Sequence, residues 1–295
     1  MQDSDPWLFG LDLDGTTLSP AGGVTERTAA AIRGVLDAGH RVAFATGRNF
    51  IEAGGVFQAT GHYDLAVLVS GAVIVDARTG RSVRRSTMNA VLAAELCAAI
   101  ETMGHAAVAF QDRHATHDDY LVSTARQVHP SLNDWLQLSG QRVAERSDLA
   151  VYEHEHTFRV STVLEFAEAA RLKAAIEGQF TGRAYVHSVV VPHDGVEIIE
   201  IFDPKVNKWQ GLLDVAELHG IPAGRIAAIG DDQNDLPMIR QAPIGVAMGN
   251  ARDELKAATP YVAASNADDG LAQFLEACVA QGPPAAAEAI RSPRR

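Results

Sequence analysis

Residues 9–18 read FGLDLDGTTL, and this stretch decides the fold. The apolar run that begins at Trp7 is short and stops at a polar loop, which predicts a buried strand with acidic residues at its C-terminal end. Side chains alternate along a strand, so Asp12 and Asp14 point the same way. Helical spacing over 25–38 and a second apolar run at 41–45 follow, and together they predict a βαβ opening. An Asp-x-Asp pair alone is more often a turn cap, so the reading depends on the other strand ends.

Length and composition predict a globular chain. It has 295 residues, of which 47% are hydrophobic and 21% charged, enough for roughly two domains with apolar cores. The net charge of −12 argues against nucleic acid and anionic membrane as partners. Acidic first residues and the lack of an apolar stretch of ~18 residues predict a cytoplasmic protein. Cys97 and Cys278 are expected to be reduced, packed thiols.

The alternation of strands and helices is interrupted once. It holds through a strand at 65–69 and a hairpin near residue 80, changes to an α+β pattern, and resumes with a helix at 207–219. The fold class is therefore α/β, a Rossmann-like parallel-sheet core with an inserted α+β cap domain. The predicted parts are a first core segment (1–85), the cap (86–202), a second core segment (203–280) and a disordered tail (281–295).

Reactive side chains follow four of the predicted strands. Open parallel sheets bind ligands at the carboxyl ends of their strands, so these side chains are expected to meet. Clustered carboxylates repel one another unless a cation holds them, and hard oxygen ligands favour Mg²⁺. The strand ends carry, in chain order, Asp12 and Asp14; Thr46, Gly47 and Arg48; Ser70 and Gly71; and Asp231, Asn234 and Asp235, with Lys208 opening a helix between them.

Four motifs in this order, FGLDLDGTTL, FATGR, VNKWQGL and IGDDQNDLPMI, resemble those of the haloacid dehalogenase superfamily of aspartyl phosphatases. The position of the insert, with VSGAVI and VAMGNA, is similar to the Cof-like branch, whose large α/β cap resembles that of sucrose-phosphate and mannosylphosphoglycerate phosphatases. The resemblance implies a Mg²⁺-dependent phosphatase of a small phosphate monoester, such as a sugar phosphate. The expected partner is a small phosphorylated metabolite. The net charge indicates no nucleic acid or membrane partner, and no obligate protein partner is evident in the sequence.

The resemblance also implies catalytic roles. Asp12 would attack phosphorus and become the aspartyl-phosphate, and Asp14 would protonate the leaving oxygen and then activate water. Thr46 would hydrogen-bond the phosphoryl group, and Lys208 would offset the charge that the nucleophile and the phosphate share.

The metal and substrate contacts are implied in the same way. Asp12, the backbone carbonyl of Asp14, and Asp231 would hold Mg²⁺, with Asp235 in or just behind the first ligand shell. Arg48 is either a phosphate-site cation or the partner of a nearby acid, and Asn250 is either a phosphate-site residue or a helix N-cap. Cof-like members often have asparagine at the position of Ser70. The residues expected to contact substrate are Gly15, Gly47, Arg48, Ser70, Gly71, Asn234 and Asn250.

Other readings compete. A phosphomutase or phosphotransferase could use the same core, and would pass the phosphoryl group to a second hydroxyl instead of water. A phospho-accepting signalling module has a similar acidic site but no large insert and no second aspartate placed like Asp14. A dinucleotide-binding oxidoreductase is disfavoured because Gly-x-Gly-x-x-Gly is absent after the first strand. The loop with His114 and His117 is expected to be solvated, and the cap is expected to read the leaving group.

Overall fold

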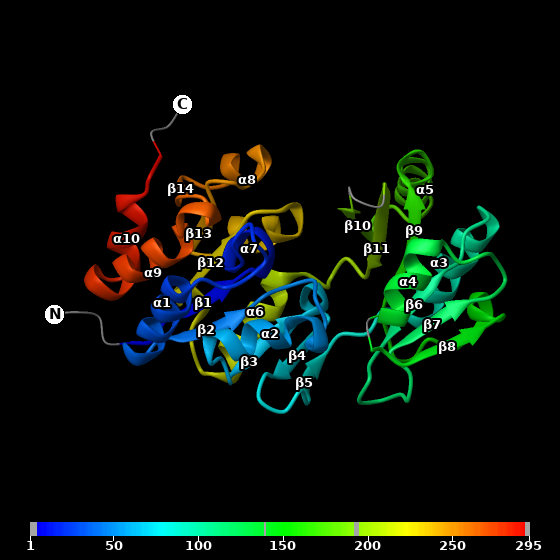
Figure 1. Ribbon diagram of the computed structural model, residues 1–295, viewed down its shortest axis with the longest axis horizontal. Helices are drawn as coiled ribbons and strands as arrows, with labels where there is room; N and C mark the ends of the chain where they lie inside the picture. The colour runs from blue at the N-terminus through cyan, green and yellow to red at the C-terminus, as the bar shows by residue number, and fades with distance from the viewer. Residues whose placement is uncertain (1–4, 139, 192–194, 293–295) are drawn as a thin grey trace. The chain divides into compact units, whose positions relative to one another are not determined.

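The computed structural model describes residues 5–138, 140–191 and 195–292. The chain divides into two compact units. We call Met1–Arg85 with Val206–Arg295 the core unit, and Ser86–Lys205 the insert unit. The chain thus leaves the core unit after Arg85 and re-enters it at Val206 (Figure 1).

A five-stranded parallel sheet forms the centre of the core unit. Its spatial order is β14-β13-β12-β1-β2, and every neighbouring pair is parallel. The central strands β1 and β12 are fully buried, as continuous apolar runs require when helices cover both faces of a sheet. The predicted α/β class is confirmed. The strands are β1 (Leu8–Leu11), β2 (Arg41–Phe44), β12 (Ile226–Gly230), β13 (Ile244–Ala247) and β14 (Tyr261–Val262).

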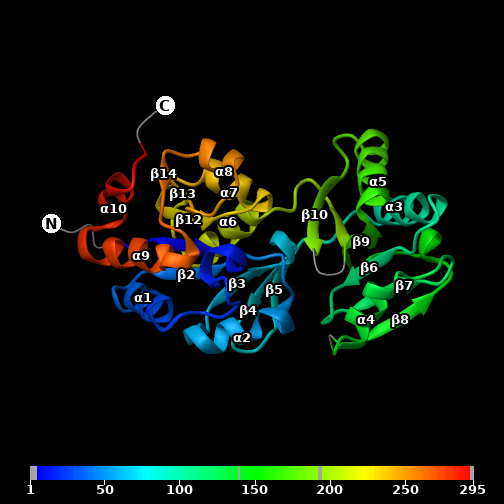
Figure 2. The ribbon, with the colours of Figure 1, turned by 45° about the horizontal axis from the view of Figure 1, so that its top comes forward.

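Helices cover this sheet in two layers (Figure 2). Helix α1 packs against α9, and α6 packs against α7. α1 begins where Thr25 accepts the N–H of Thr28, and it buries the stripe that contains Ile32 and Val35. The helices are α1 (Glu26–Asp37), α2 (Phe50–Thr60), α6 (Lys208–Leu218), α7 (Leu236–Gln241), α8 (Asp253–Ala257) and α9 (Gly270–Gln281).

A small antiparallel sheet extends the core unit next to β2. It contains β3 (Leu65–Leu68), β4 (Val73–Asp76) and β5 (Ser82–Arg85), in that order. A parallel bridge between Ala45 and Val67 joins it to the end of β2. The predicted hairpin is therefore present, and β3 brings the turn that follows it to the end of β2.

The predicted disordered tail is wrong for the residues that the structure describes. Residues 283–289 form a helix, α10 (Pro283–Ala289), which packs against α9, and Arg291 then bridges to Tyr261. Proline is tolerated in the first turn of a helix, and alanine has the highest helix propensity, so the Pro-Ala run starts a helix here. Residues 293–295 of the predicted tail lie outside the described ranges.

The insert unit has a six-stranded sheet in the order β10-β11-β9-β6-β7-β8. All neighbours are antiparallel except β7 and β8. The turn expected at 192–194 lies outside the described residues. The elements are α3 (Ala90–Thr102), β6 (Val108–Gln111), β7 (Tyr120–Ser123), α4 (Pro130–Leu138), β8 (Val143–Arg146), β9 (Thr157–Glu165), α5 (Phe166–Gln179), β10 (Tyr185–Val191) and β11 (Val196–Phe202).

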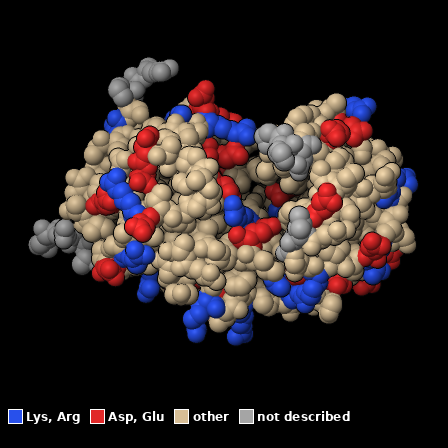
Figure 3. Space-filling view, in the orientation of Figure 1, with Lys and Arg blue, Asp and Glu red and all other residues tan. Residues whose placement is uncertain are grey.

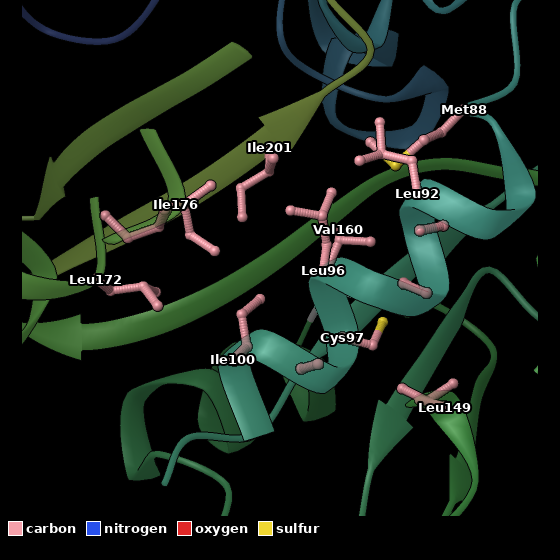
Figure 4. Packing of buried hydrophobic residues seen from close by; sticks show 14 of the residues in the cluster. Met88, Leu92, Leu96, Cys97, Ile100, Leu149, Val160, Leu172, Ile176 and Ile201 are labelled. Carbon is pink, nitrogen blue, oxygen red and sulfur yellow. The ribbon is translucent and has the colours of Figure 1, made fainter. Parts of the chain in front are cut away.

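The insert unit has its own hydrophobic core. Leu96 and Ile100 of α3 pack toward Val160 of β9, and Leu172 and Ile176 of α5 belong to the same cluster (Figure 4). These five residues are at most 1% exposed, and the other buried members of the cluster are at most 4% exposed. The insert unit is thus a second folded body and not an elaborated loop.

Both cysteines, Cys97 and Cys278, are buried free thiols, as predicted. Acidic and basic side chains are interspersed over the face seen in Figure 3. None of the helices in the described ranges has the length and hydropathy needed to cross a bilayer.

Candidate active site

The topology of the core sheet places two acidic strand ends side by side. From β1 the chain moves to β2 on one side, and it later returns as β12 on the other side of β1. Ligands bind at such a switch point, outside the carboxyl ends of the strands. Leu11 is in register with Ile229, and the N–H of Asp12 donates to the carbonyl of Ile229 at 3.0 Å. Asp12 and Asp231 are therefore neighbours.

The turn after β1 is shaped around Asp231. Leu18 N–H donates to the carbonyl of Leu13 at 2.8 Å, and Thr17 Oγ1 donates to the carbonyl of Asp12 at 2.6 Å. Gly15 has φ +75°, and a Cβ there would lie 2.1 Å from Asp231 Oδ2. Glycine is thus required at this position, both for the backbone conformation and for the close approach of a carboxylate.

Asp12, Asp231 and Asp235 form a cluster that we call the carboxylate triad. Each offers an oxygen, and these oxygens all lie within 4.8 Å of one another. Burial, followed by the charge of Asp235, raises the pKa of Asp12 well above its usual value and that of Asp231 to about 7. Three such carboxylates are unfavourable without positive charge, and an all-oxygen donor set fits a hard cation such as Mg²⁺.

Lys208 supplies one fixed positive charge to the triad. Its Nζ donates to Asp12 Oδ1 at 2.6 Å and to Asp235 Oδ1 at 2.6 Å, and also to Asn234 Oδ1 at 3.2 Å. The lysine is 1% exposed; burial opposes its charge, but Asp12 and Asp235 more than compensate and raise its pKa. Lys208 is the first residue of α6, which Asn207 caps by accepting the N–H of Gln210.

The three carboxylates are not equivalent. Asp235 uses Oδ1 for Lys208 and accepts the N–H groups of Asp231 and Asp232 on Oδ2, at 2.9 and 3.1 Å. Asp231 Oδ1 accepts a hydrogen bond from Thr16 Oγ1 at 3.1 Å. Asp235 therefore holds the loop and the lysine in place, whereas Asp12 and Asp231 are better placed to give an oxygen to a metal.

A second group gathers where β2 and β3 end. Thr46 is buried, with its N–H on the carbonyl of Val67 at 3.0 Å and its carbonyl on the N–H of Ser70 at 2.9 Å. A Cβ on Gly47 would lie 3.4 Å from Ser70 Oγ and 3.9 Å from Asn234 Nδ2. Ser70 Oγ is buried and has no hydrogen-bond partner among the described residues. The expected neighbourhood of Thr46, Gly47, Ser70 and Asn234 is thus present in the core unit.

Gly71 lies beside the base of α6. It has φ +107°, and a Cβ there would lie 2.2 Å from the carbonyl oxygen of Asn207. Its place is therefore explained by contact with the residue before Lys208, so in this structure Gly71 supports the position of the lysine.

The sequence allowed two roles each for Arg48 and Asn250, and the structure shows what each of them contacts. Arg48 pairs with the carboxylate of Asp14, which favours the reading as the partner of an acid. Asn250 donates to the carbonyl of Gly15 at 2.8 Å and accepts the N–H of Asn266 at 2.9 Å. It is not the N-cap of α8, because Arg252 holds that position, so that reading is wrong.

Some site contacts were not predicted. Thr16 and Thr17 fix Asp231 and the backbone of Asp12, and Asn266 connects Asn250 to the carbonyl of Leu18 at 2.8 Å. The threonines follow Asp-Gly directly, and hydroxyl groups in such a turn are a usable signal for hydrogen bonds to its backbone. Nothing in the local sequence connects residue 266 to the turn after β1.

The histidine-rich loop of the insert unit contains no metal cluster among the described residues. His117 is exposed and contacts Asp118 at 3.0 Å. Asp119 is buried and pairs with Arg142 at 3.2 Å and Arg113 at 3.5 Å. Asp119 therefore stabilises the loop, which makes it unsuitable as a probe of substrate contact.

Comparisons with known proteins identify the family of this chain. Residues 9–275 match the family described as haloacid dehalogenase-like hydrolase. The 5-amino-6-(5-phospho-D-ribitylamino)uracil phosphatase of Bacillus subtilis is 27% identical, over 93% of this chain and 98% of the relative. The pyridoxal phosphate phosphatase of Escherichia coli is 26% identical, over 91% and 97%.

Solved structures with a similar fold come from the same family. A haloacid dehalogenase-like hydrolase from Bacteroides thetaiotaomicron superposes with a TM-score of 0.73 at 21% identity, over 92% of this chain and 99% of that structure. The family match spans both segments of the core unit and the insert unit between them. The chain belongs to the haloacid dehalogenase-like hydrolases, as its motifs predicted.

Proposed function

We propose that this chain is a Mg²⁺-dependent phosphatase that hydrolyses a small phosphorylated metabolite through an aspartyl-phosphate on Asp12. The observation that supports it best is the buried Lys208, which holds one oxygen of Asp12 within a carboxylate triad. The family is one of hydrolases, and the two relatives above are phosphatases named for phosphate monoesters of small metabolites. A sugar phosphate or a related ester is the substrate class we infer.

Asp12 would be the nucleophile. Lys208 fixes Oδ1, and the other carboxylate oxygen would form a bond to phosphorus while the bond from phosphorus to the ester oxygen breaks. The ammonium group would offset the negative charge shared between Asp12 and the phosphoryl oxygens, and it needs no reorganisation because it is already in place. Water would then attack the phosphorus and release inorganic phosphate and the free Asp12.

Asp12 and Asp231 would hold the metal, with Asp235 behind them. When bound, the ion neutralises phosphoryl charge and so favours attack by an anionic nucleophile. The backbone carbonyl of Asp14 remains a further ligand that the family resemblance implies. Ser70 Oγ, buried and without a partner in the described structure, would donate to a phosphoryl oxygen near Gly47.

Asp14 would exchange protons with the leaving oxygen and with water. Its side chain is 62% exposed, unlike that of Asp12, so a leaving group can reach it. Two carboxylates with such different environments suit two different tasks. We infer that Asp14 gives a proton to the departing oxygen and later takes one from the attacking water.

The test is phosphate release from a panel of phosphorylated metabolites with Mg²⁺, using wild type and Asp12→Asn. The variant should lose turnover while its circular dichroism is unchanged, because the amide is nearly isosteric but a poor nucleophile. Asp37→Asn, at the exposed end of α1, is the matched control and should keep wild-type rates. Near-normal turnover by Asp12→Asn would exclude the mechanism.

The same assay separates hydrolysis from transfer. A phosphatase releases one inorganic phosphate for each ester consumed, whereas a mutase or phosphotransferase leaves the phosphoryl group on a hydroxyl. Phosphorus NMR of the products would show a new ester in the second case. Stoichiometric inorganic phosphate is the expected result.

A further inference from the structure

Arg48 lies just before Asn49, the N-cap of α2, and its side chain reaches the carboxylate of Asp14. Its Nε donates to Asp14 Oδ2 at 2.9 Å and its Nη2 to Oδ1 at 2.6 Å. Its Nη1 donates to the carbonyl of Glu52 at 3.2 Å. The planar guanidinium thus grips both oxygens of one carboxylate and is itself attached to a helix.

The backbone of Arg48 is fixed as well. Its N–H donates to Thr46 Oγ1 at 3.2 Å, and its carbonyl accepts the N–H of Val69 at 3.1 Å. The next residue, Asn49, caps α2 in a reciprocal capping box with Glu52. Arg48 is therefore a rigid bracket that connects the end of β2, the turn after β3 and the start of α2.

Asp14 lacks such support from its own segment. It lies in the turn between Leu13 and Gly15, with a non-helical backbone and a mostly exposed side chain. A carboxylate in this position can rotate, and each rotamer places its oxygens differently. A two-point contact with a fixed guanidinium restricts the plane of the carboxylate, which a point charge such as lysine cannot do.

Among the described residues, the side-chain hydrogen bonds of Arg48 do not go to the triad. Lys208 already lies between Asp12 and Asp235, at 2.6 Å from each. The hydrogen bonds of the Arg48 side chain go to Asp14 and Glu52. Its arrangement thus serves the acid at the rim of the site.

We propose that Arg48 is the positioning residue for Asp14, setting where the proton donor meets the leaving oxygen. The inference rests on the proposed function. In the step concerned, the bond from phosphorus to the ester oxygen breaks and an oxygen of Asp12 bonds to phosphorus. Asp14, protonated on one oxygen and held by Arg48 through the other, passes its proton to the departing oxygen and becomes the carboxylate that Arg48 grips at both oxygens. Arg48 acts through Asp14 and does not contact the substrate.

The leaving group distinguishes this role from phosphate binding. The value of kcat/KM counts the steps up to departure of the leaving group. An alkoxide needs a proton to leave, whereas 4-nitrophenolate leaves without one. Arg48→Met should therefore lower kcat/KM about 100-fold for an alkyl phosphate, as expected for a misplaced catalytic group. For 4-nitrophenyl phosphate the loss should be only about tenfold. Arg48→Lys should recover only part of the loss.

A double-mutant cycle tests whether Arg48 acts through Asp14. In the Asp14→Asn background, Arg48→Met should cause little further loss on the alkyl ester, because the group it positions is already gone. Arg27→Met is the matched control. Arg27 grips Glu276 with the same two donors, at 2.9 and 2.7 Å, on the helices α1 and α9, and its loss should leave both substrates unaffected.

Two results would overturn the inference. Equal losses on both esters, with weaker inhibition by inorganic phosphate, would make Arg48 a phosphate-binding residue. Multiplying losses in the cycle would show that it acts independently of Asp14. The proposed function fails separately, through turnover by Asp12→Asn, so the two failures cannot be confused.

Discussion

Gly15 and Asp231 show how closely single residues are fitted at this site. The glycine combines a left-handed backbone, φ +75°, with a position where any Cβ would lie 2.1 Å from a triad oxygen. Gly39, which ends α1, has a similar φ of +87° but no atom within 4 Å of its Cβ position. Substituting Gly15 and Gly39 in turn therefore distinguishes the effect of backbone strain, which both share, from the effect of displacing a carboxylate, which only Gly15 has.

We expect Gly15→Ala and Gly39→Ala to differ in activity more than in stability. Both should lose on the order of 1–2 kcal/mol of unfolding free energy, because an L-residue is strained in this conformation. Only Gly15→Ala should also lose phosphatase activity and Mg²⁺ affinity, because Asp231 must move. Urea unfolding and Mg²⁺ titration of turnover would measure the two effects. Equal activity of both variants would show that the site tolerates a displaced Asp231.

Replacing Lys208 should change both turnover and the free energy of unfolding. Lys208→Met should abolish turnover and lower the free energy of unfolding by about 3–5 kcal/mol in the absence of metal, since it leaves buried carboxylates unpaired. Lys205→Met, three residues earlier and exposed, is the control. Mg²⁺ should restore part of the lost stability. A variant as stable as wild type in chelator would mean that the carboxylates are neutral there.

At the scale of elements, the sequence located the site because its residues follow buried strands. Asp12, Asp231 and Asp235 could be predicted to meet because they follow buried strands, and Lys208 because of the motif that contains it. The four residues do lie together. The partner of Arg48 could not, because the choice between Asp14 and a phosphate depends on side-chain torsions. The contact of Asn250 with Asn266 could not either, since it joins segments that no local pattern relates.

Other elements were missed for different reasons. The strands β7 and β8 are four residues each, and β8 is only half-buried, so their alternation is too short to recognise. The helix α10 was hidden by its prolines and alanines, which also occur in disordered tails. Packing against α9 stabilises this segment as a helix, and the local sequence pattern contains no information about that packing.

The packing of α10 leads to a prediction for this element. Deleting residues 283–295 removes the buried Pro283, Ala286 and Ala287 and the hydrogen bonds of Tyr261 with Glu288 and Arg291. A buried methylene is worth about 0.8 kcal/mol, so we expect a loss of about 2–3 kcal/mol of unfolding free energy with little change in kcat/KM. Thermal unfolding measures it. An unchanged Tm would mean that α10 adds nothing to the core unit.

At the scale of the whole molecule, the candidate active-site residues all lie in one of two separately packed units. The triad, Lys208 and Arg48 all belong to the core unit, while the insert unit has a separate hydrophobic core. The tryptophans are divided in the same way, with Trp7 and Trp209 in the core unit and Trp135 in the insert unit. Fluorescence can therefore follow each unit: Trp135→Phe leaves only core signals, and Trp7→Phe with Trp209→Phe leaves only the insert signal.

The pH dependence of the core unit should reveal the triad. The pKa of Asp231 is raised from its usual 3.8 to about 7, so the folded state holds a proton that the unfolded state releases. Without metal, this carboxyl imposes no penalty below pH 4, and stability is lost as the pH rises through 7. Asp12, whose pKa is also raised, acts in the same direction. Mg²⁺ binds the charged carboxylates, so it should oppose this loss and stabilise most at high pH.

The expected result is a rise in Tm on adding Mg²⁺ that is confined to the core unit and grows between pH 5 and pH 8. At 100 times the dissociation constant, a ligand adds about 2.7 kcal/mol, or roughly 5–10 °C for a unit of this size. Asp231→Asn should abolish the rise, and the insert signal should not respond. A Mg²⁺ effect that is equal at both pH values would mean that protons and metal do not compete for the triad. A rise in the Tm that Trp135 reports would indicate a metal site outside the carboxylate triad.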